Sequence, residues 1–159
     1  MFDNDLFVIN DTPADEFSAS QWNVMVVDDD MDIHVVTRFC LADTVIGNRR
    51  LNLIDAYSGQ EAIKQLKDND SIDLILLDVV METQNAGLDV ARWLRENPQR
   101  ASTPKIILRT GQPGKYNIGD IANNGLVDAV LQKSSITYAS LVMTISEMLL
   151  GPSPAAGMN

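Results

Sequence analysis

The sequence has few of the features that would place it in several large classes of protein. It contains a single cysteine, Cys40, which excludes an internal disulfide framework and fits a reducing cytoplasm. It has no run of lysine and arginine and a net charge of −10, so it is a poor candidate for binding nucleic acid or an anionic membrane. No apolar stretch approaches the roughly 20 residues that span a bilayer, and the first residues lack the basic start of a signal peptide. We therefore expect a cytoplasmic protein.

The chain of 159 residues is long enough for one domain with a sizeable core. Residues 1–21 hold five acidic side chains and no lysine or arginine, and we expect them to form an acidic N-terminal extension. Residues 151–159 are rich in proline, alanine and glycine, which is typical of a linker. This tail either ends the protein or leads to an output domain. The folded domain is thus expected over residues 22–150.

Residues 22–150 alternate between short apolar runs and segments with helical periodicity. Apolar runs bounded by polar residues are typical of strands that are buried on both faces of a parallel sheet. The alternation predicts an α/β fold, a flavodoxin-like (βα)5 doubly wound parallel sheet with strand order 2-1-3-4-5 and right-handed crossovers. The expected strands are 23–28, 51–56, 73–78, 104–109 and 127–132, and the expected helices are 31–44, 59–68, 87–96, 117–124 and 135–150.

Three of the predicted helices carry local boundary signals. Ser58 precedes the second helix with Glu61 three residues on, which is the pattern of a capping box. Pro98 stops the third helix. Ser134 or Ser135 is the expected cap of the last helix, which has more apolar residues than one buried face needs. Either these residues form a wide core stripe, or the helix shares some of them with a dimer partner or an output domain.

Acidic and polar residues stand at the ends of four of the predicted strands. Asp28 and Asp29 follow the first strand, Asp78 the third, Thr110 the fourth and Lys133 the fifth. Ligands of an open parallel sheet bind beyond the carboxyl ends of its strands, and the predicted order places the first and third strands side by side. We therefore expect one hollow in which three carboxylates, a hydroxyl and an ammonium suit a divalent cation and a phosphoryl group.

The carboxylates predict a site for Mg²⁺ or Mn²⁺, because hard cations prefer carboxylate and carbonyl oxygens. Asp29, Asp78 and the backbone carbonyl of Val80 would bind the ion, and Asp28 would hold one of its waters. The second oxygen of Asp78 would then be free to attack phosphorus, since carboxylates act as covalent nucleophiles. The ion and the lysine ammonium would neutralise charge on the transferring group. Gly111, which lacks a side chain, would let that group approach its backbone N–H.

At these positions the sequence resembles the receiver domain of two-component response regulators. The resemblance implies that a sensor histidine kinase, a phosphotransfer protein or a small phosphodonor phosphorylates Asp78. It implies that Thr110 is the switch hydroxyl and that Lys133 contacts the phosphoryl group. A receiver is a phosphoacceptor and not an enzyme in its own right, and it switches the face formed by the fourth strand, fourth helix and fifth strand. The matching strings are Val-Val-Asp-Asp-Asp (26–30), Leu-Leu-Asp-Val-Val-Met (76–81), Leu-Arg-Thr-Gly (108–111) and Lys133, in order over about residues 23–150.

A narrower resemblance is to receivers found ahead of HD-GYP-type cyclic-di-GMP phosphodiesterase modules. It implies that this chain is the regulatory part of a larger phosphodiesterase. No residues of an HD-GYP module are present in the sequence. The resemblance is carried by Asp-Val-Val-Met-Glu-Thr (78–83), Ala-Gly-Leu-Asp (86–89) and Leu-Arg-Thr-Gly-Gln-Pro-Gly (108–114).

Three positions depart from the receiver pattern. Ser134 follows Lys133 where receivers carry proline, often after a cis bond, so we expect a trans peptide here and a lysine that is aimed differently. Val130 occupies the place of the switch aromatic, and Glu82 follows Met81 in place of a proline. These departures keep open the alternative of a pseudo-receiver, a constitutive interaction or dimerisation module.

A covalent hydrolase of the dehalogenase type would also use Asp78 as its nucleophile. Val80, two residues on, offers no acid to protonate a leaving group or to aim a water, which disfavours this class. The same argument predicts slow self-hydrolysis of a phosphorylated form, with Gln112 as the nearby polar side chain that would orient water.

The sequence also predicts whether two further side chains are exposed to solvent. His34 falls in the first turns of a helix and is expected at the surface. Arg109 ends an otherwise apolar strand and is expected to snorkel to the surface, with no role assigned.

Overall fold

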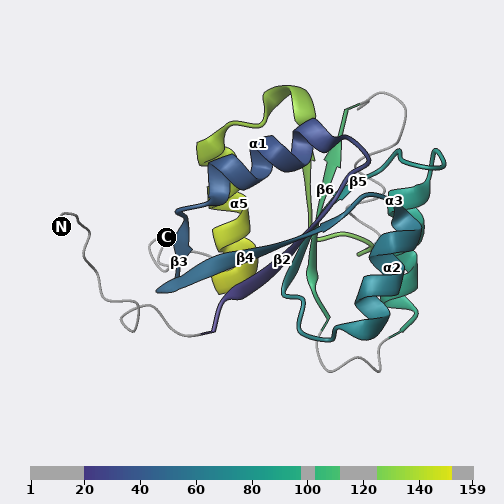
Figure 1. The fold of residues 1–159 in the computed structure, drawn as a ribbon, viewed down its shortest axis with the longest axis horizontal. Coiled ribbons are helices and arrows are strands. Elements are labelled where there is room, and N and C mark those ends of the chain that lie inside the picture. The colour runs from purple at the N-terminus through teal and green to yellow at the C-terminus, as the bar shows by residue number, and fades with distance from the viewer. Residues whose placement is uncertain (1–19, 98–102, 112–124, 152–159) are drawn as a thin grey trace.

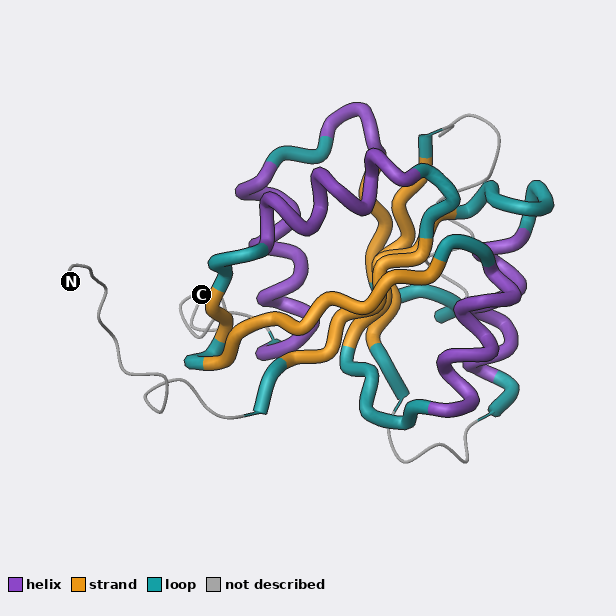
Figure 2. Tube along the Cα trace, viewed as in Figure 1, coloured by secondary structure: helices purple, strands orange, loops and turns teal. Residues whose placement is uncertain are grey.

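A twisted sheet lies between two layers of helices in the computed structural model, which describes residues 20–97, 103–111 and 125–151 (Figure 1). Figure 2 shows the strands running side by side through the centre, with helices on either side. Along the chain the elements are β2 (Trp22–Val27), α1 (Met31–Leu41), β3 (Val45–Ile46), β4 (Arg49–Ala56), α2 (Gly59–Asp68), β5 (Leu74–Asp78), α3 (Ala86–Arg95), β6 (Lys105–Thr110), β7 (Ala129–Gln132), the 3₁₀ turn η2 (Lys133–Ser135) and α5 (Tyr138–Leu150).

The parallel strands have the order that the sequence predicts. β4, β2, β5, β6 and β7 are neighbours in that order and all pair in parallel, which is the arrangement 2-1-3-4-5. Val27 of β2 pairs with Leu77 of β5, so the carboxyl ends of these two strands lie at one level. The flavodoxin-like α/β fold is thus confirmed, and it brings Asp28 beside Asp78.

The sheet has one strand that the sequence pattern does not predict. In the described part of the chain it has six strands, because β3 pairs antiparallel with β4 at the edge. The two strands are joined by Gly47 and Asn48, both with positive φ (57° and 67°), which is typical of a tight hairpin turn. Two residues of strand are too few to show an alternating pattern, so the sequence carries no signal for β3.

The observed helices agree with the predicted ones in three described cases and differ at the start of the last. α1, α2 and α3 lie within a few residues of the expected bounds. α5 begins at Tyr138, and its cap is Thr137, whose side chain accepts from the Ser140 backbone N–H while the Ser140 hydroxyl accepts in return. The prediction of a cap at Ser134 or Ser135 is wrong, because these residues form the turn η2.

Some expectations lie outside the described residues. These are the predicted fourth helix at 117–124, most of the acidic extension, the tail at 152–159, Pro98 and Gln112. No helix within the described ranges is long and apolar enough to cross a bilayer.

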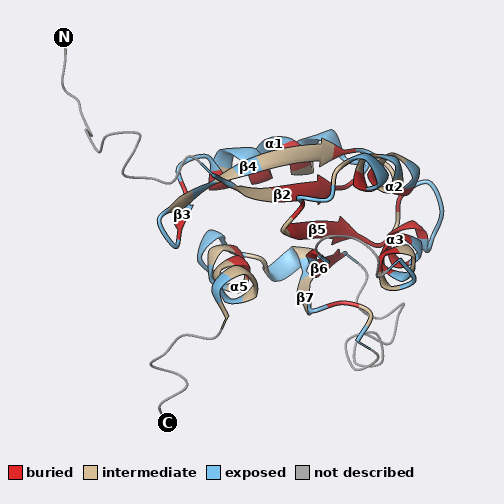
Figure 3. Ribbon diagram, turned by 90° about the horizontal axis from the view of Figure 1, so that it is seen from below, coloured by how far each residue is buried: buried red, intermediate tan, exposed pale blue. Residues whose placement is uncertain are grey.

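The core lies on both faces of the sheet. α2 and α3 cover one face, and α1 and α5 cover the other (Figures 1 and 3). Every residue of β5, the central strand, is buried, as expected for a strand covered on both sides. α5 contributes Leu141 and Ile145 to its side of the core, whereas its Met143 and Leu150 are exposed.

Candidate functional site

Three carboxylates lie together beyond the carboxyl ends of β2 and β5. Oxygens of Asp28, Asp29 and Asp78 lie within 4.8 Å of one another. Asp28 and Asp78 are buried and Asp29 is exposed, so the cluster opens to solvent on one side. Asp28 is held by the backbone N–H of Asp30, which donates to its Oδ1 at 2.9 Å. An oxygen-only donor set of this size fits a hard divalent cation.

Lys133 reaches both buried carboxylates from the end of β7. Its Nζ lies 3.0 Å from Asp28 Oδ2 and 3.2 Å from Asp78 Oδ1. Burial alone would lower the pKa of Lys133, but its hydrogen bond to Asp28 and the charges of both aspartates outweigh burial and raise it. The side chain is therefore an ammonium at neutral pH.

The Lys133–Ser134 peptide is trans, as the absence of proline leads one to expect, and Lys133 still contacts both buried carboxylates. The described residues contain no cis peptide bond, and the chain passes from β7 directly into η2. The long lysine side chain can still follow the attraction of two buried carboxylates, and it ends between them.

The surroundings of Asp78 disfavour its charge in the absence of a cation. Burial and the neighbouring charge of Asp28 raise the pKa of Asp78 to about 6, although Lys133 acts in the opposite direction. Three carboxylates facing one ammonium leave an excess of negative charge. A divalent cation would remove this excess and favour the ionised nucleophile.

Thr110 and Gly111 lie at the neighbouring strand end. Thr110 is buried and pairs in register with Gln132, the residue before Lys133. Of the atoms in the described residues, a Cβ added to Gly111 would meet only Lys133 Cδ, at 3.7 Å. Val80 is half-buried two residues beyond Asp78.

Gly87 belongs to the Ala-Gly-Leu-Asp (86–89) motif, but the sequence did not indicate that it has a role in the site. Its backbone N–H donates to the carbonyl of Val79 at 2.9 Å, at the start of α3. A Cβ at this position would overlap the backbone carbonyl of Asp78. α3 therefore packs directly against the backbone that carries the predicted phosphoacceptor, and only glycine permits this approach.

Glu82, which stands where receivers carry proline, caps the N-terminus of α2 with its carboxylate. The backbone N–H groups of Gly59 and Gln60 donate to its two carboxylate oxygens at 2.8 and 2.9 Å. Partial burial would raise the pKa of Glu82, but these two hydrogen bonds outweigh it and lower that pKa. The carboxylate thus joins the loop after β5 to the N-terminus of α2, where a negative charge is favourable.

We expect Glu82→Gln to lower the free energy of unfolding by about 1 kcal/mol at neutral pH, because it removes the charge and one acceptor. The folded-state pKa of Glu82 lies below 4.5, so its contribution is present above pH 4.5 and is lost as the pH falls below it. Urea unfolding at pH 7 and in steps below pH 4.5 measures both effects. Glu147→Gln, on the exposed side of α5, is the matched control. An equal loss in the control, or a difference that persists well below pH 4, would contradict this role.

His34 is buried, so the expectation that it lies at the surface is wrong. Its side chain is 3% exposed, with Nε2 2.7 Å from the backbone carbonyl of Asp28 and Nδ1 2.8 Å from Asp55 Oδ1. The ring also packs on Tyr57, with centroids 4.3 Å apart. Burial would raise the pKa of Asp55, but hydrogen bonds from His34 and Arg38 outweigh it and lower that pKa. His34 lies on the face of α1 that is buried in the protein, whereas Met31 and Val35 of the same turns are exposed.

Arg109 is also buried, contrary to the expectation that it snorkels to the surface. It is 4% exposed, and its Nη1 donates to Thr37 Oγ1 of α1 at 3.0 Å. Its Nε and Nη2 have no hydrogen-bond partner within the described residues. Burial lowers the pKa of Arg109, although the charges of Asp28 and Asp78 oppose this shift. The side chain points from β6 toward α1, where helix packing closes its path to solvent.

Comparison with known proteins identifies the family to which this arrangement belongs. The sequence profile of the response regulator receiver domain matches residues 24–141. The chain is 38% identical over 132 residues to 3'3'-cGAMP-specific phosphodiesterase 2 of Vibrio cholerae serotype O1, covering 83% of this chain and 25% of that protein. It is 36% identical over 85 residues to the transcriptional regulatory protein CpxR of Escherichia coli K12, covering 54% and 32%. The chain thus spans a quarter to a third of these relatives.

A solved structure gives the same result for the fold. The signal receiver domain of a two-component signal transduction histidine kinase from Clostridium thermocellum superposes with a TM-score of 0.68 at 20% identity. The match covers 82% of this chain and 99% of that one. With the profile match over most of its length, the chain belongs to the response regulator receiver domain family of two-component signalling.

Proposed function

We propose that this receiver domain accepts a phosphoryl group on Asp78 in a reaction that requires Mg²⁺ or Mn²⁺. The observation that carries the proposal is the placement of Asp78 between the acidic pair and the Lys133 ammonium, 3.2 Å from its Oδ1. The phosphoryl donor would be a sensor histidine kinase or a phosphotransfer protein, and the domain would act in the cytoplasm.

Each residue has a role in this proposal. Asp29, Asp78 and the Val80 carbonyl would hold the cation, with Asp28 on one of its waters, and the cation would neutralise the phosphoryl oxygens. A carboxylate oxygen of Asp78 would attack phosphorus as the bond to the donor breaks, leaving an acyl phosphate and the freed donor. Lys133 would then donate to a phosphoryl oxygen.

The switch would begin at the end of β6. The hydroxyl of Thr110 would donate to a phosphoryl oxygen, and the backbone N–H of Gly111 would contact another. These two contacts would pull the end of β6 toward the phosphoryl group and shift the face that includes β6 and β7, the fourth and fifth strands of the predicted order. Val130, in the place of the usual aromatic, is half-buried and packs against the core, so output would not depend on a rotating ring.

The alternative is a pseudo-receiver that acts as a constitutive interaction or dimerisation module. Its motivation is the presence of Ser134 and Val130 at positions where receivers carry other residues. The pairing of Lys133 with both buried carboxylates favours a working site, since a site without function has no need to hold a half-buried lysine between two acids.

The domain would be regulatory and not itself catalytic. Its acyl phosphate would hydrolyse slowly, because the apolar side chain of Val80 cannot orient a water molecule for attack on phosphorus. The 38% identity to a cyclic dinucleotide phosphodiesterase supports a place in a larger enzyme of that class, whose activity would reside in a further C-terminal domain. The exposed Met143 and Leu150 on α5 would be available to that output domain or to a second copy of the chain.

Incubation with acetyl phosphate, followed by intact mass measurement, tests the proposed function. We expect a gain of one phosphoryl group per chain with Mg²⁺, and no gain when EDTA replaces Mg²⁺. Asp29→Asn should lower uptake at limiting Mg²⁺ by at least about tenfold, whereas Asp89→Asn, an exposed aspartate on α3, should not change it. Uptake that is equal with EDTA would contradict the metal dependence. No uptake under any condition would favour the pseudo-receiver.

A further inference from the structure

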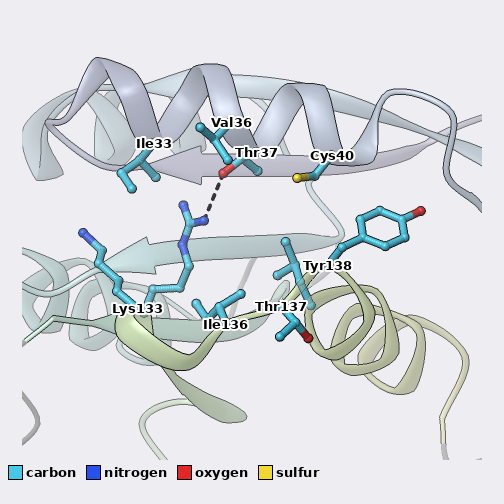
Figure 4. A pocket seen from close by; sticks show the side chains of 10 residues that line it. Ile33, Val36, Thr37, Cys40, Lys133, Ile136, Thr137 and Tyr138 are labelled. Atoms are coloured by element: carbon cyan, nitrogen blue, oxygen red, sulfur yellow. Dashed lines mark hydrogen bonds between the residues drawn. The ribbon is translucent and has the colours of Figure 1, made fainter.

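A pocket of about 180 Å³ lies between α1 and the segment that joins η2 to α5 (Figure 4). It adjoins the acidic site and shares Lys133 with it, but none of the three aspartates lines it. Ile33, Val36 and Cys40 of α1 lie above it in this view, and Ile136 and Thr137 lie below. The described residues that line it are Ile33, Val36, Thr37, Cys40, Arg109, Lys133, Ile136, Thr137, Tyr138 and Leu141.

The pocket combines mainly apolar walls with a buried cation. Arg109 lines it and is 4% exposed. The hydrogen bond drawn in Figure 4 joins its Nη1 to Thr37 Oγ1. Lys133 also lines the pocket, but its ammonium is ion-paired with Asp28 and Asp78. The guanidinium is therefore the charged group that remains available to a ligand.

The unused atoms of Arg109 define the chemistry of that ligand. Nε and Nη2 have no hydrogen-bond partner in the described part of the chain. In a planar guanidinium these two nitrogens share one edge, and their N–H groups point the same way, so they match the two oxygens of a carboxylate. A buried charged donor without a partner is costly, so a ligand that satisfies this edge gains affinity.

We propose that this pocket binds a small amphipathic carboxylate. The carboxylate would pair with Nε and Nη2 of Arg109, and a short apolar chain would lie between Ile33 and Val36 on one side and Ile136 and Leu141 on the other. The volume is below the range typical of sites for drug-sized ligands, so the molecule is small.

Two other ligands fit these observations less well. The apolar walls offer little to the additional oxygens of a phosphate. An acidic side chain on a protein partner would have to reach a guanidinium that is 4% exposed, and the net charge of −10 repels an acidic protein surface more than a single carboxylate. The proposal does not depend on phosphoryl transfer, because Asp28, Asp29 and Asp78 do not line the pocket.

Calorimetric titration of the whole chain with straight-chain carboxylates tests this inference. We expect affinity to rise from acetate through butyrate to hexanoate as more apolar surface is buried. Hexanamide, which has the same shape without the charge, should bind at least about tenfold more weakly than hexanoate, since hydrogen bonds to charged groups are stronger. Inorganic phosphate should not compete with hexanoate.

Arg109→Met should weaken hexanoate binding at least about tenfold, whereas Arg92→Met, an exposed arginine of α3, should leave it unchanged. Because Arg109→Met removes a buried and only partly satisfied charge, its melting temperature should equal or exceed that of the wild type. Equal binding of hexanamide, equal binding by Arg109→Met, displacement by phosphate or no binding of any free carboxylate would overturn the proposal. The comparison of hexanoate with hexanamide uses the wild-type chain, so it tests the proposal even if the Arg109→Met variant does not fold.

Discussion

Asp78→Asn is expected to abolish phosphoryl uptake and, at the same time, to stabilise the domain when no divalent cation is present. An amide has no anionic oxygen that can attack phosphorus, so uptake from acetyl phosphate should fall at least about a hundredfold. The gain in stability follows from the environment of the carboxyl group. Burial and the charge of Asp28 raise the pKa of Asp78 from 3.8 to about 6.

The sign of this stability effect depends on pH. Between about pH 4 and 6 the folded state holds a proton that the unfolded state releases, so wild-type stability falls as the pH rises through this range. Above pH 6 the penalty is complete and amounts to roughly 3 kcal/mol, or less after relaxation. The advantage of Asp78→Asn should therefore grow from pH 4 to pH 6 and remain constant above it.

Urea unfolding in EDTA at pH 4.5 and pH 7.5 measures the difference, with Asp89→Asn as the control whose effect on stability should be the same at both pH values. Mg²⁺ should narrow the gap at pH 7.5, because it binds the folded wild type more tightly than the variant. A variant that is less stable than the wild type at pH 7.5 in EDTA would contradict the electrostatic account of the site.

Gly87→Ala is expected to lower the free energy of unfolding by about 3 kcal/mol or more, although it adds only one methyl group. The new Cβ would overlap the backbone carbonyl of Asp78, and neither backbone segment can yield without moving α3 or the end of β5. The same displacement should slow phosphoryl uptake, because it moves the nucleophile relative to Lys133.

Gly111→Ala is the matched control for stability. Within the described ranges its Cβ would meet only Lys133 Cδ, at 3.7 Å, which is an ordinary van der Waals contact. We expect no loss in the free energy of unfolding from this change, measured by urea unfolding beside Gly87→Ala. Similar stability of Gly87→Ala and the wild type would show that the contact between α3 and Asp78 is not rigid.

The parts of the fold that the sequence predicted are those that a repeated local pattern determines. The parallel strands are apolar runs that end in polar residues, and their order follows from the rules for doubly wound sheets. The start of α5 was less predictable, because Ser134, Ser135 and Thr137 all have hydroxyls that can cap a helix. The reciprocal hydrogen bond from Ser140 distinguishes Thr137, and this is visible only in three dimensions.

The missed side chains have partners that are distant in sequence. His34 contacts Asp55, 21 residues away, and Arg109 donates to Thr37, 72 residues away. Glu82 accepts from Gly59 across 23 residues. A helical or strand period shows which face of an element is apolar, but it does not show which polar side chain meets another element. These contacts therefore required the tertiary structure.

The most direct test of the central claim is to locate the phosphoryl group. The domain would be incubated with acetyl phosphate and Mg²⁺ and then reduced with borohydride, which converts an aspartyl phosphate to homoserine. Peptide mass spectrometry would identify the modified position. We predict homoserine at position 78 and at no other aspartate. Homoserine at position 28 or 29, or its absence from every peptide despite a gain in intact mass, would contradict the assignment of Asp78 as the phosphoacceptor.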